Sequence, residues 1–96
     1  MESGPGEPAD APKAPDRVKP RYIAYTYRRM AERGITEEQI EYVLRNYDTR
    51  RPSPPYRNGE KPSEIFIGDC DGRRLKVYVE RDSDPPFIKT AVWEGD

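Results

Sequence analysis

Residues 25–40 read YTYRRMAERGITEEQI, and this stretch predicts one helix, a glycine stop and the start of a second helix. Ile23, Tyr27 and Met30 lie four and three positions apart, which would place them on one stripe of the first helix. Gly34 supplies the left-handed residue that commonly ends a helix. The architecture of the chain therefore begins with two short helices in succession.

The second helix is expected from Glu37 to about Tyr47. Thr36 and Gln39 have the capping-box spacing, and the acidic residues that follow Thr36 favour the positive end of a helix dipole. The apolar stripe of this helix recurs at helical spacing and contains Ile40, Val43, Leu44 and Tyr47. We expect the two amphipathic helices to pack as a hairpin.

From Ser63 onward the apolar residues alternate with a period of two, which predicts strands. Residues 48–62 contain four prolines and are expected to form an extended connector before them. Three strands are predicted, with inward positions at Ile65 and Ile67, then Leu75, Val77 and Val79, then Ile88, Thr90 and Val92. The predicted fold class is α+β, with two N-terminal helices packed on a three-stranded antiparallel meander.

Composition limits what the chain can be. Residues 1–19 are rich in proline and acids and predict a disordered leader, and residues 20–96 predict a single α+β domain. Residues 17–61 hold eleven bases and six acids, a net charge of +5 within a chain of net charge −1. That segment either meets an anionic partner or forms a solvated face. No long apolar run and no signal core are found, so a cytoplasmic location is expected.

The open face of the predicted sheet is the main candidate site. If Leu75, Val77 and Val79 face inward, Arg74, Lys76 and Tyr78 must face the other way. The same alternation puts further residues on that face, namely Phe66, Lys89, Ala91 and Trp93. Exposed aromatic rings with cations are the composition that single-stranded RNA binding requires, although strand-forming Tyr and Trp also occur on ordinary solvated faces.

Further candidate cations lie outside the strands. Arg28, Arg29 and Arg33 cluster on the first helix, where they either bind an anion or pair with neighbouring acids. Arg50 and Arg51 in the connector are expected to be exposed. These residues are candidates for contacts to RNA or another anion.

Metal and thiol chemistry are not expected. Asp69 and Asp71 belong to one predicted turn and Asp82 and Asp84 to another, so turn formation explains them better than metal binding. Cys70 is the only cysteine and the chain has no histidine to activate it. We therefore predict neither a metal site nor a cofactor.

The motif Y-T-Y-R-R-M-A-E-R-G-I-T, with the strand Ile88–Trp93, resembles a small prokaryotic family known as domain of unknown function 4258. That family in turn distantly resembles the BrnT and RelE toxins. Tyr25 stands where the family usually has histidine, the obvious general base for attack of a ribose 2′-hydroxyl. The resemblance implies a RelE/BrnT-like fold and toxin-like RNA binding or cleavage.

Two functions remain open from the sequence. As an enzyme, the chain would be a metal-independent endoribonuclease with Lys76, Tyr78, Arg74 and Tyr25 as catalytic candidates, and an antitoxin-like protein would be its expected partner. As a non-catalytic module, it would bind a protein or a nucleic acid. RNA is an expected partner of the enzyme, and a nucleic acid such as RNA is one of the two possible partners of the non-catalytic module.

Overall fold

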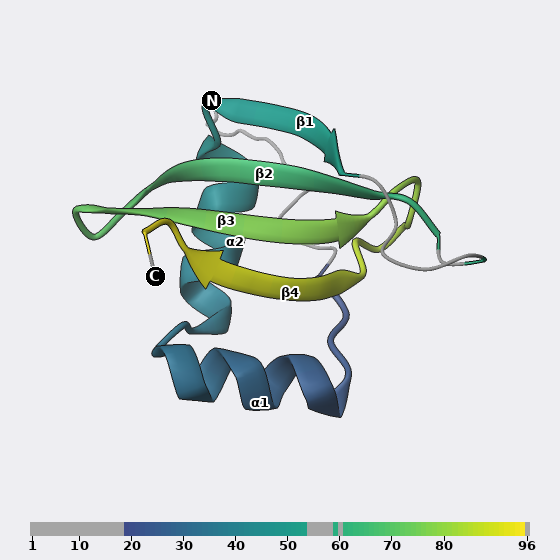
Figure 1. Cartoon of the computed structure of the whole chain (residues 1–96), viewed down its shortest axis with the longest axis horizontal. Coiled ribbons are helices and arrows are strands. Elements are labelled where there is room, and N and C mark those ends of the chain that lie inside the picture. The colour runs from purple at the N-terminus through teal and green to yellow at the C-terminus, as the bar shows by residue number, and fades with distance from the viewer. Residues whose placement is uncertain (1–18, 54–58, 60, 96) are drawn as a thin grey trace, which may run out of the picture.

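The computed structural model describes residues 19–53, 59 and 61–95. Its elements are α1 (Ala24–Arg33), α2 (Glu37–Asn46), β1 (Thr49–Ser53), β2 (Ser63–Cys70), β3 (Arg73–Glu80) and β4 (Ile88–Trp93), as Figure 1 shows. The α+β class predicted from the sequence is confirmed. Apart from Lys19, the predicted leader lies outside the described residues.

The prediction of three strands was wrong, because the sheet has four antiparallel strands in the order β1-β2-β3-β4. The missed strand, β1, lies in the proline-rich segment that was expected to be a connector. The Arg81 amide donates to the Pro62 carbonyl oxygen at 2.9 Å. Backbone groups of successive residues point to opposite sides of a strand, so the even-numbered residues of β2 bond to β3 and the odd-numbered ones bond to β1. Pro52, which pairs with Glu64, therefore points its nitrogen away from β2, where an edge strand tolerates a missing N–H.

Helix α1 lies along β4, and its buried side only partly matches the predicted stripe. Met30 is buried as predicted, but Ile23 and Tyr27 are 48% and 44% exposed, and Thr26 is buried instead. The Thr26 hydroxyl lies 3.2 Å from the Ile88 carbonyl oxygen and 3.0 Å from that of Lys89. A polar residue therefore occupies the helix–strand contact, because its hydroxyl satisfies carbonyls on the outer edge of β4.

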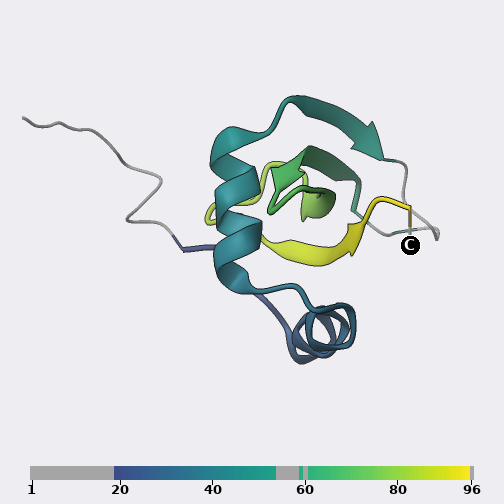
Figure 2. The same ribbon diagram turned by 90° about the vertical axis from the view of Figure 1, so that its left-hand side faces the viewer.

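The junction between the helices forms as the sequence indicates. Gly34 adopts a left-handed conformation with φ of 68°, and the Ile35 amide donates back to the Met30 carbonyl at 2.9 Å. Thr36 and Gln39 form both hydrogen bonds of the capping box. The helices then run in different directions, so the expected helical hairpin was wrong: α1 packs along β4 and α2 crosses β2 and β3 (Figures 1 and 2).

Helix α2 approaches β2 closely, and this approach reverses the predicted faces of that strand. A Cβ atom added at Gly68 would lie 3.2 Å from the Tyr47 Cα atom, so only glycine fits comfortably beneath the end of the helix. Since Gly68 faces α2, Phe66 faces it too, and Ile65 and Ile67 face the opposite side, where both are nevertheless buried at 6% exposure. Phe66 was predicted on the open face and instead packs against the core.

A bulge in β4 reverses the predicted faces from Thr90 to Trp93, whereas Ile88 before it is buried as predicted. Tyr78 pairs with Thr90 but Val79 pairs with Ile88, which leaves Lys89 as the extra residue. Ala91 and Trp93, predicted to be open, are therefore buried at 0% and 4% exposure. The core between the sheet and the helices is completed by Met30, Ile35, Ile40, Val43, Cys70, Leu75, Val77, Val79 and Ile88. No helix within the described ranges is long and apolar enough to cross a membrane.

Candidate functional site

The face of the sheet opposite α2, called the open face below, carries the residues that the sequence singled out most strongly. Leu75, Val77 and Val79 are buried in the core, so the alternate residues of β3 face away from α2. The strand register aligns Thr49, Ile67, Lys76 and Val92 in one row and Arg51, Ile65, Tyr78 and Thr90 in the next, with Ser53, Ser63 and Glu80 beyond.

Lys76 and Tyr78 occupy the middle of the open face, as predicted. Lys76 lies between Ile67 and Val92 in its row, and Tyr78 lies between Ile65 and Thr90. Both side chains are half-buried. Within residues 19–53, 59 and 61–95, the Lys76 ammonium makes no hydrogen bond or ion pair. An ammonium and a phenol therefore stand next to each other among three aliphatic side chains and one threonine.

Arg51 adds a second cation from the newly found strand. Arg51 is exposed and lies on β1, two strands away from Tyr78 on β3 and in the same row. Neighbouring strands are about 4.8 Å apart, which places the backbone of Arg51 roughly 10 Å from that of Tyr78. A residue that the sequence assigned to a loose connector is thus held in register with the centre of the face.

Lys89 lies on the same face, as predicted, and is the extra residue of the bulge in β4. Its ammonium donates to the Lys61 carbonyl oxygen at 2.7 Å, beside the Lys61–Glu80 ion pair of 3.7 Å. Glu80 belongs to the row beyond Tyr78. Lys89 therefore adds a third cation at the far end of the open face.

Arg33 borders the open face without being part of it. One guanidinium nitrogen donates to the Thr90 hydroxyl at 3.1 Å and to the Ala91 carbonyl oxygen at 2.9 Å. The Trp93 indole in turn donates to the Arg33 carbonyl oxygen at 2.7 Å. These bonds tie the end of α1 to the outer edge of β4, so the first role of Arg33 is structural.

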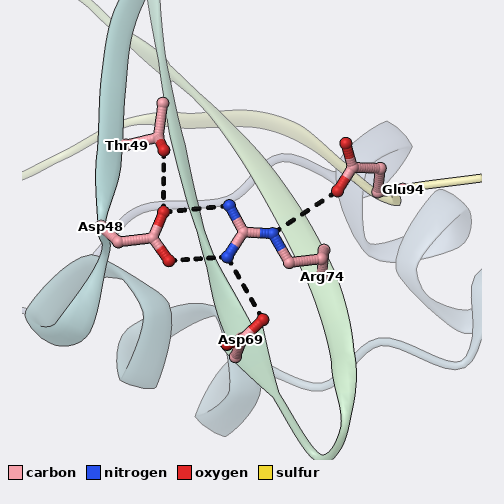
Figure 3. Close-up of polar contacts among 5 residues, drawn as sticks. All are labelled: Asp48, Thr49, Asp69, Arg74 and Glu94. Carbon is pink, nitrogen blue, oxygen red and sulfur yellow. Dashed lines mark hydrogen bonds and ion pairs between the residues drawn. The ribbon is translucent and has the colours of Figure 1, made fainter.

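Arg74 lies on the open face but is surrounded by carboxylates (Figure 3). It donates to both oxygens of Asp48 at 2.6 and 2.9 Å and to Asp69 at 3.2 Å, and its Nε lies 3.5 Å from Glu94. Hydrogen bonds from Arg74 and then from Thr49 lower the pKa of Asp48 to about 2. We call Arg74 and its three carboxylates the Arg74 cluster; its net charge is −2, which is unsuited to an anion.

The remaining arginines of α1 lie apart from this face. Arg29 donates to the Tyr25 hydroxyl at 3.1 Å and to Glu32 at 3.1 Å, and these hydrogen bonds raise the pKa of Arg29. Arg28 is exposed and lies on the side of α1 away from the buried Met30. Tyr25 therefore pairs with its own helix and does not meet Lys76 or Tyr78.

Arg50 and Trp93 lie on the other side of the sheet. Arg50 makes two hydrogen bonds to Glu64 at 2.9 and 3.2 Å and stands over the Phe66 ring, 5.1 Å from its centroid. Trp93 lies in the core beneath the Arg73 guanidinium, which is 4.4 Å from the indole ring. Neither side chain can join a ligand site on the open face.

The described residues offer no metal centre, since no group of three or more His, Cys, Asp or Glu side chains among them could hold a metal ion. Cys70 is buried, and burial, with a smaller effect from Asp71, raises the pKa of its thiol. A protonated thiol is a poor nucleophile. The open face therefore offers cations, carboxylates, hydroxyls and the Tyr78 phenol.

Residues 26–93 match the family model described as Domain of unknown function (DUF4258). The chain belongs to this family. The same comparisons find no similar curated protein and no similar solved structure. The family membership confirms the resemblance seen in the helical motif, and it assigns no activity.

The structure thus brings together Arg51, Lys76, Tyr78 and Lys89, and places Arg33 at their border. Two features of this arrangement were not predicted. The Arg74 cluster depends on Asp48, whose position follows from β1, and a proline-rich segment gives little sign of a strand. The bulge was signalled only by the run Phe87–Trp93, where the apolar residues fit two opposite alternations.

Proposed function

We propose that this protein binds single-stranded RNA on the open face of its sheet. The observation that carries the proposal is the common placement of Arg51, Lys76 and Lys89 around Tyr78 on a face that no described helix covers. The charged residues named from the Lys76 row to the far end of the face comprise four bases and one acid, namely Arg51, Lys76, Lys89, Lys61 and Glu80.

Each component of the face suits one part of a nucleotide. Ammonium and guanidinium groups bind phosphates, and an aromatic ring stacks on an unpaired base, which contributes about 1–3 kcal/mol per base. Tyr78 is the one aromatic residue of β3, and its neighbour Ile65, which is 6% exposed, packs beside it and supports the ring. A sheet face with a ring near its centre receives a splayed single strand more readily than a paired one.

The distant resemblance to BrnT and RelE toxins supports the same ligand. Toxins of the RelE type use Lys, Arg and Tyr without a required histidine, and a chain that lacks histidine can match that pattern. RNA cleavage is the second candidate function. It is favoured by the neighbouring positions of Lys76 and Tyr78, which could stabilise phosphate charge and carry a proton.

Binding is better supported than cleavage, because two catalytic candidates are engaged elsewhere. Arg74 is held by three carboxylates, and Tyr25 pairs with Arg29 on α1. An antitoxin-like partner, which the toxin resemblance suggests, belongs with the cleavage proposal.

The test of binding is fluorescence polarisation with a labelled single-stranded RNA, for wild type, Lys76→Gln and Tyr78→Ala. Arg28→Gln is the matched control, since it removes one positive charge on the exposed side of α1. We expect Tyr78→Ala to weaken binding about 5-fold to 150-fold and Lys76→Gln to reduce the salt slope by about 0.7. Equal affinities for Lys76→Gln and Arg28→Gln would remove the open face as the binding site.

The test of cleavage uses Tyr78→Phe, which keeps the ring and removes the hydroxyl. If Tyr78 moves a proton, this variant binds RNA like wild type but no longer cleaves it, and its expression no longer affects bacterial growth. Wild-type expression that leaves both growth and RNA intact would eliminate cleavage and leave the binding proposal standing.

A further inference from the structure

The open face is electrostatically divided along its strands. At one end, the Arg74 cluster carries three carboxylates for one guanidinium. Asp69 pairs in register with Arg74, and Glu94 donates its backbone amide to the Arg74 carbonyl oxygen at 2.8 Å, so these groups form the row that precedes Lys76. One row along β3 corresponds to about 7 Å.

The cations, by contrast, are spread across the strands. Arg51 is on β1, Lys76 on β3 and Lys89 on β4. Three interstrand spacings separate β1 from β4, which is roughly 14 Å. That distance accommodates about four stacked nucleotides at 3.4 Å each, and fewer nucleotides of an extended strand.

We infer that bound RNA crosses the strands of the sheet from Arg51 on β1 to Lys89 on β4, and that Asp69 and Glu94 exclude its phosphates from the Arg74 end. This inference rests on the proposed function. A path along β3 would place a phosphate over the Arg74 cluster, where two uncompensated negative charges repel it. The path across the strands meets three cations, and the one acid near it, Glu80, is already paired with Lys61.

The ligand is accordingly a short single-stranded segment held by about three phosphates. For single strands the logarithm of affinity falls with the logarithm of salt concentration by about 0.7 per phosphate, so we expect a slope near −2. Affinity for a homopolymer series should rise up to about four nucleotides and change little beyond that length.

The decisive variant is Arg51→Gln, measured by polarisation with labelled oligouridine of two to ten nucleotides. If RNA crosses the strands, this variant loses about 0.7 of the salt slope and binds several-fold more weakly. Lys89→Gln tests the opposite end of the path by the same two quantities, the salt slope and the affinity. Wild-type slopes for both variants, while wild type itself binds RNA, would overturn the path and leave the proposed function intact.

The exclusion by acids is tested separately with Glu94→Gln, compared with Glu38→Gln on α2. Both remove one exposed negative charge, and Glu94 lies 3.5 Å from Arg74 while remaining about half exposed. A charge about 10 Å from a phosphate changes affinity by about twofold in water, so Glu94→Gln should bind RNA about twofold more tightly than Glu38→Gln. Equal affinities for the two variants would overturn the exclusion. No binding by wild type would refute the proposed function itself.

Discussion

The bulge in β4 gives the sharpest test of the fold, because it decides which side chains of the strand after it are buried. Ala91 is 0% exposed in the core, whereas Val92 is half-buried on the open face beside Lys76. A regular strand without the bulge would exchange these environments. The matched substitutions are Ala91→Leu and Val92→Leu, which place the same side chain at adjacent positions.

The two substitutions should differ in their effect on the free energy of unfolding, because Ala91 is enclosed by the core and Val92 is only half-buried. Leucine at position 91 adds three carbon atoms to a packed core and should lower the free energy of unfolding by about 1–3 kcal/mol. Leucine at position 92 adds one methylene at a half-open site and should change it by less than about 0.5 kcal/mol. Each kcal/mol corresponds to about 4–8 °C in melting temperature for a domain of this size.

The assay is urea and thermal denaturation followed by circular dichroism, with the urea dependence compared to confirm that both variants unfold in the same way. We expect a lower midpoint for Ala91→Leu and a midpoint near wild type for Val92→Leu. The reverse order would refute the bulge and return Trp93 to the open face.

Three further predictions concern single contacts. The pKa of Asp48 is lowered to about 2, so its pairing with Arg74 stabilises the fold above its ordinary pKa near 4, and this contribution is lost as the pH falls toward 2. Arg74→Met should therefore be less stable than wild type at pH 6 and nearly equal at pH 2, as measured by urea denaturation at each pH. Thr26→Val should destabilise the fold by about 1–3 kcal/mol, because the β4 carbonyls lose their hydroxyl donor. Thr26→Ser keeps the hydroxyl and should destabilise the fold less. Equal melting temperatures for the two variants would contradict this role of Thr26. The buried Cys70 thiol, with its raised pKa, should react with a disulfide reagent at least about tenfold more slowly in the native state than in urea, and equal rates would show that the thiol is accessible.

The parts of the fold that the sequence predicted are those fixed by local chemistry. Gly34 ends α1 because a left-handed residue is needed there, and Thr36 with Gln39 starts α2 through reciprocal hydrogen bonds. The tight turn before β3 follows from Asp71 and Gly72, which both adopt positive φ. Such signals depend on a few adjacent residues, so they survive whatever the rest of the chain does.

The faces of β2 could not be predicted from alternation alone, because apolar residues occupy both sides of that strand. Ile65 and Ile67 suggested one inward face, and Phe66 with Cys70 suggested the other. The tertiary contact that decides between them is the approach of α2 to Gly68, where any larger side chain would meet the helix backbone. A glycine within a strand was the one signal of close approach in the sequence.

The sequence predicted Lys76, Tyr78 and Lys89 on the open face, and it missed only the strand that brings Arg51 into register with them. Lys76 and Tyr78 depend only on the alternation of β3, a strand with a regular pattern, and they lie where that pattern places them. Lys89 also lies on the face where the alternation places it, because it follows the buried Ile88 before the bulge shifts the rest of β4. Arg51 joins them only because an edge strand tolerates Pro52. The irregular strand β1 thus supplies a cation that would help to turn a solvated sheet face into a binding face, and disrupting β1 should move Arg51 off that face while leaving Lys76 and Tyr78 in place.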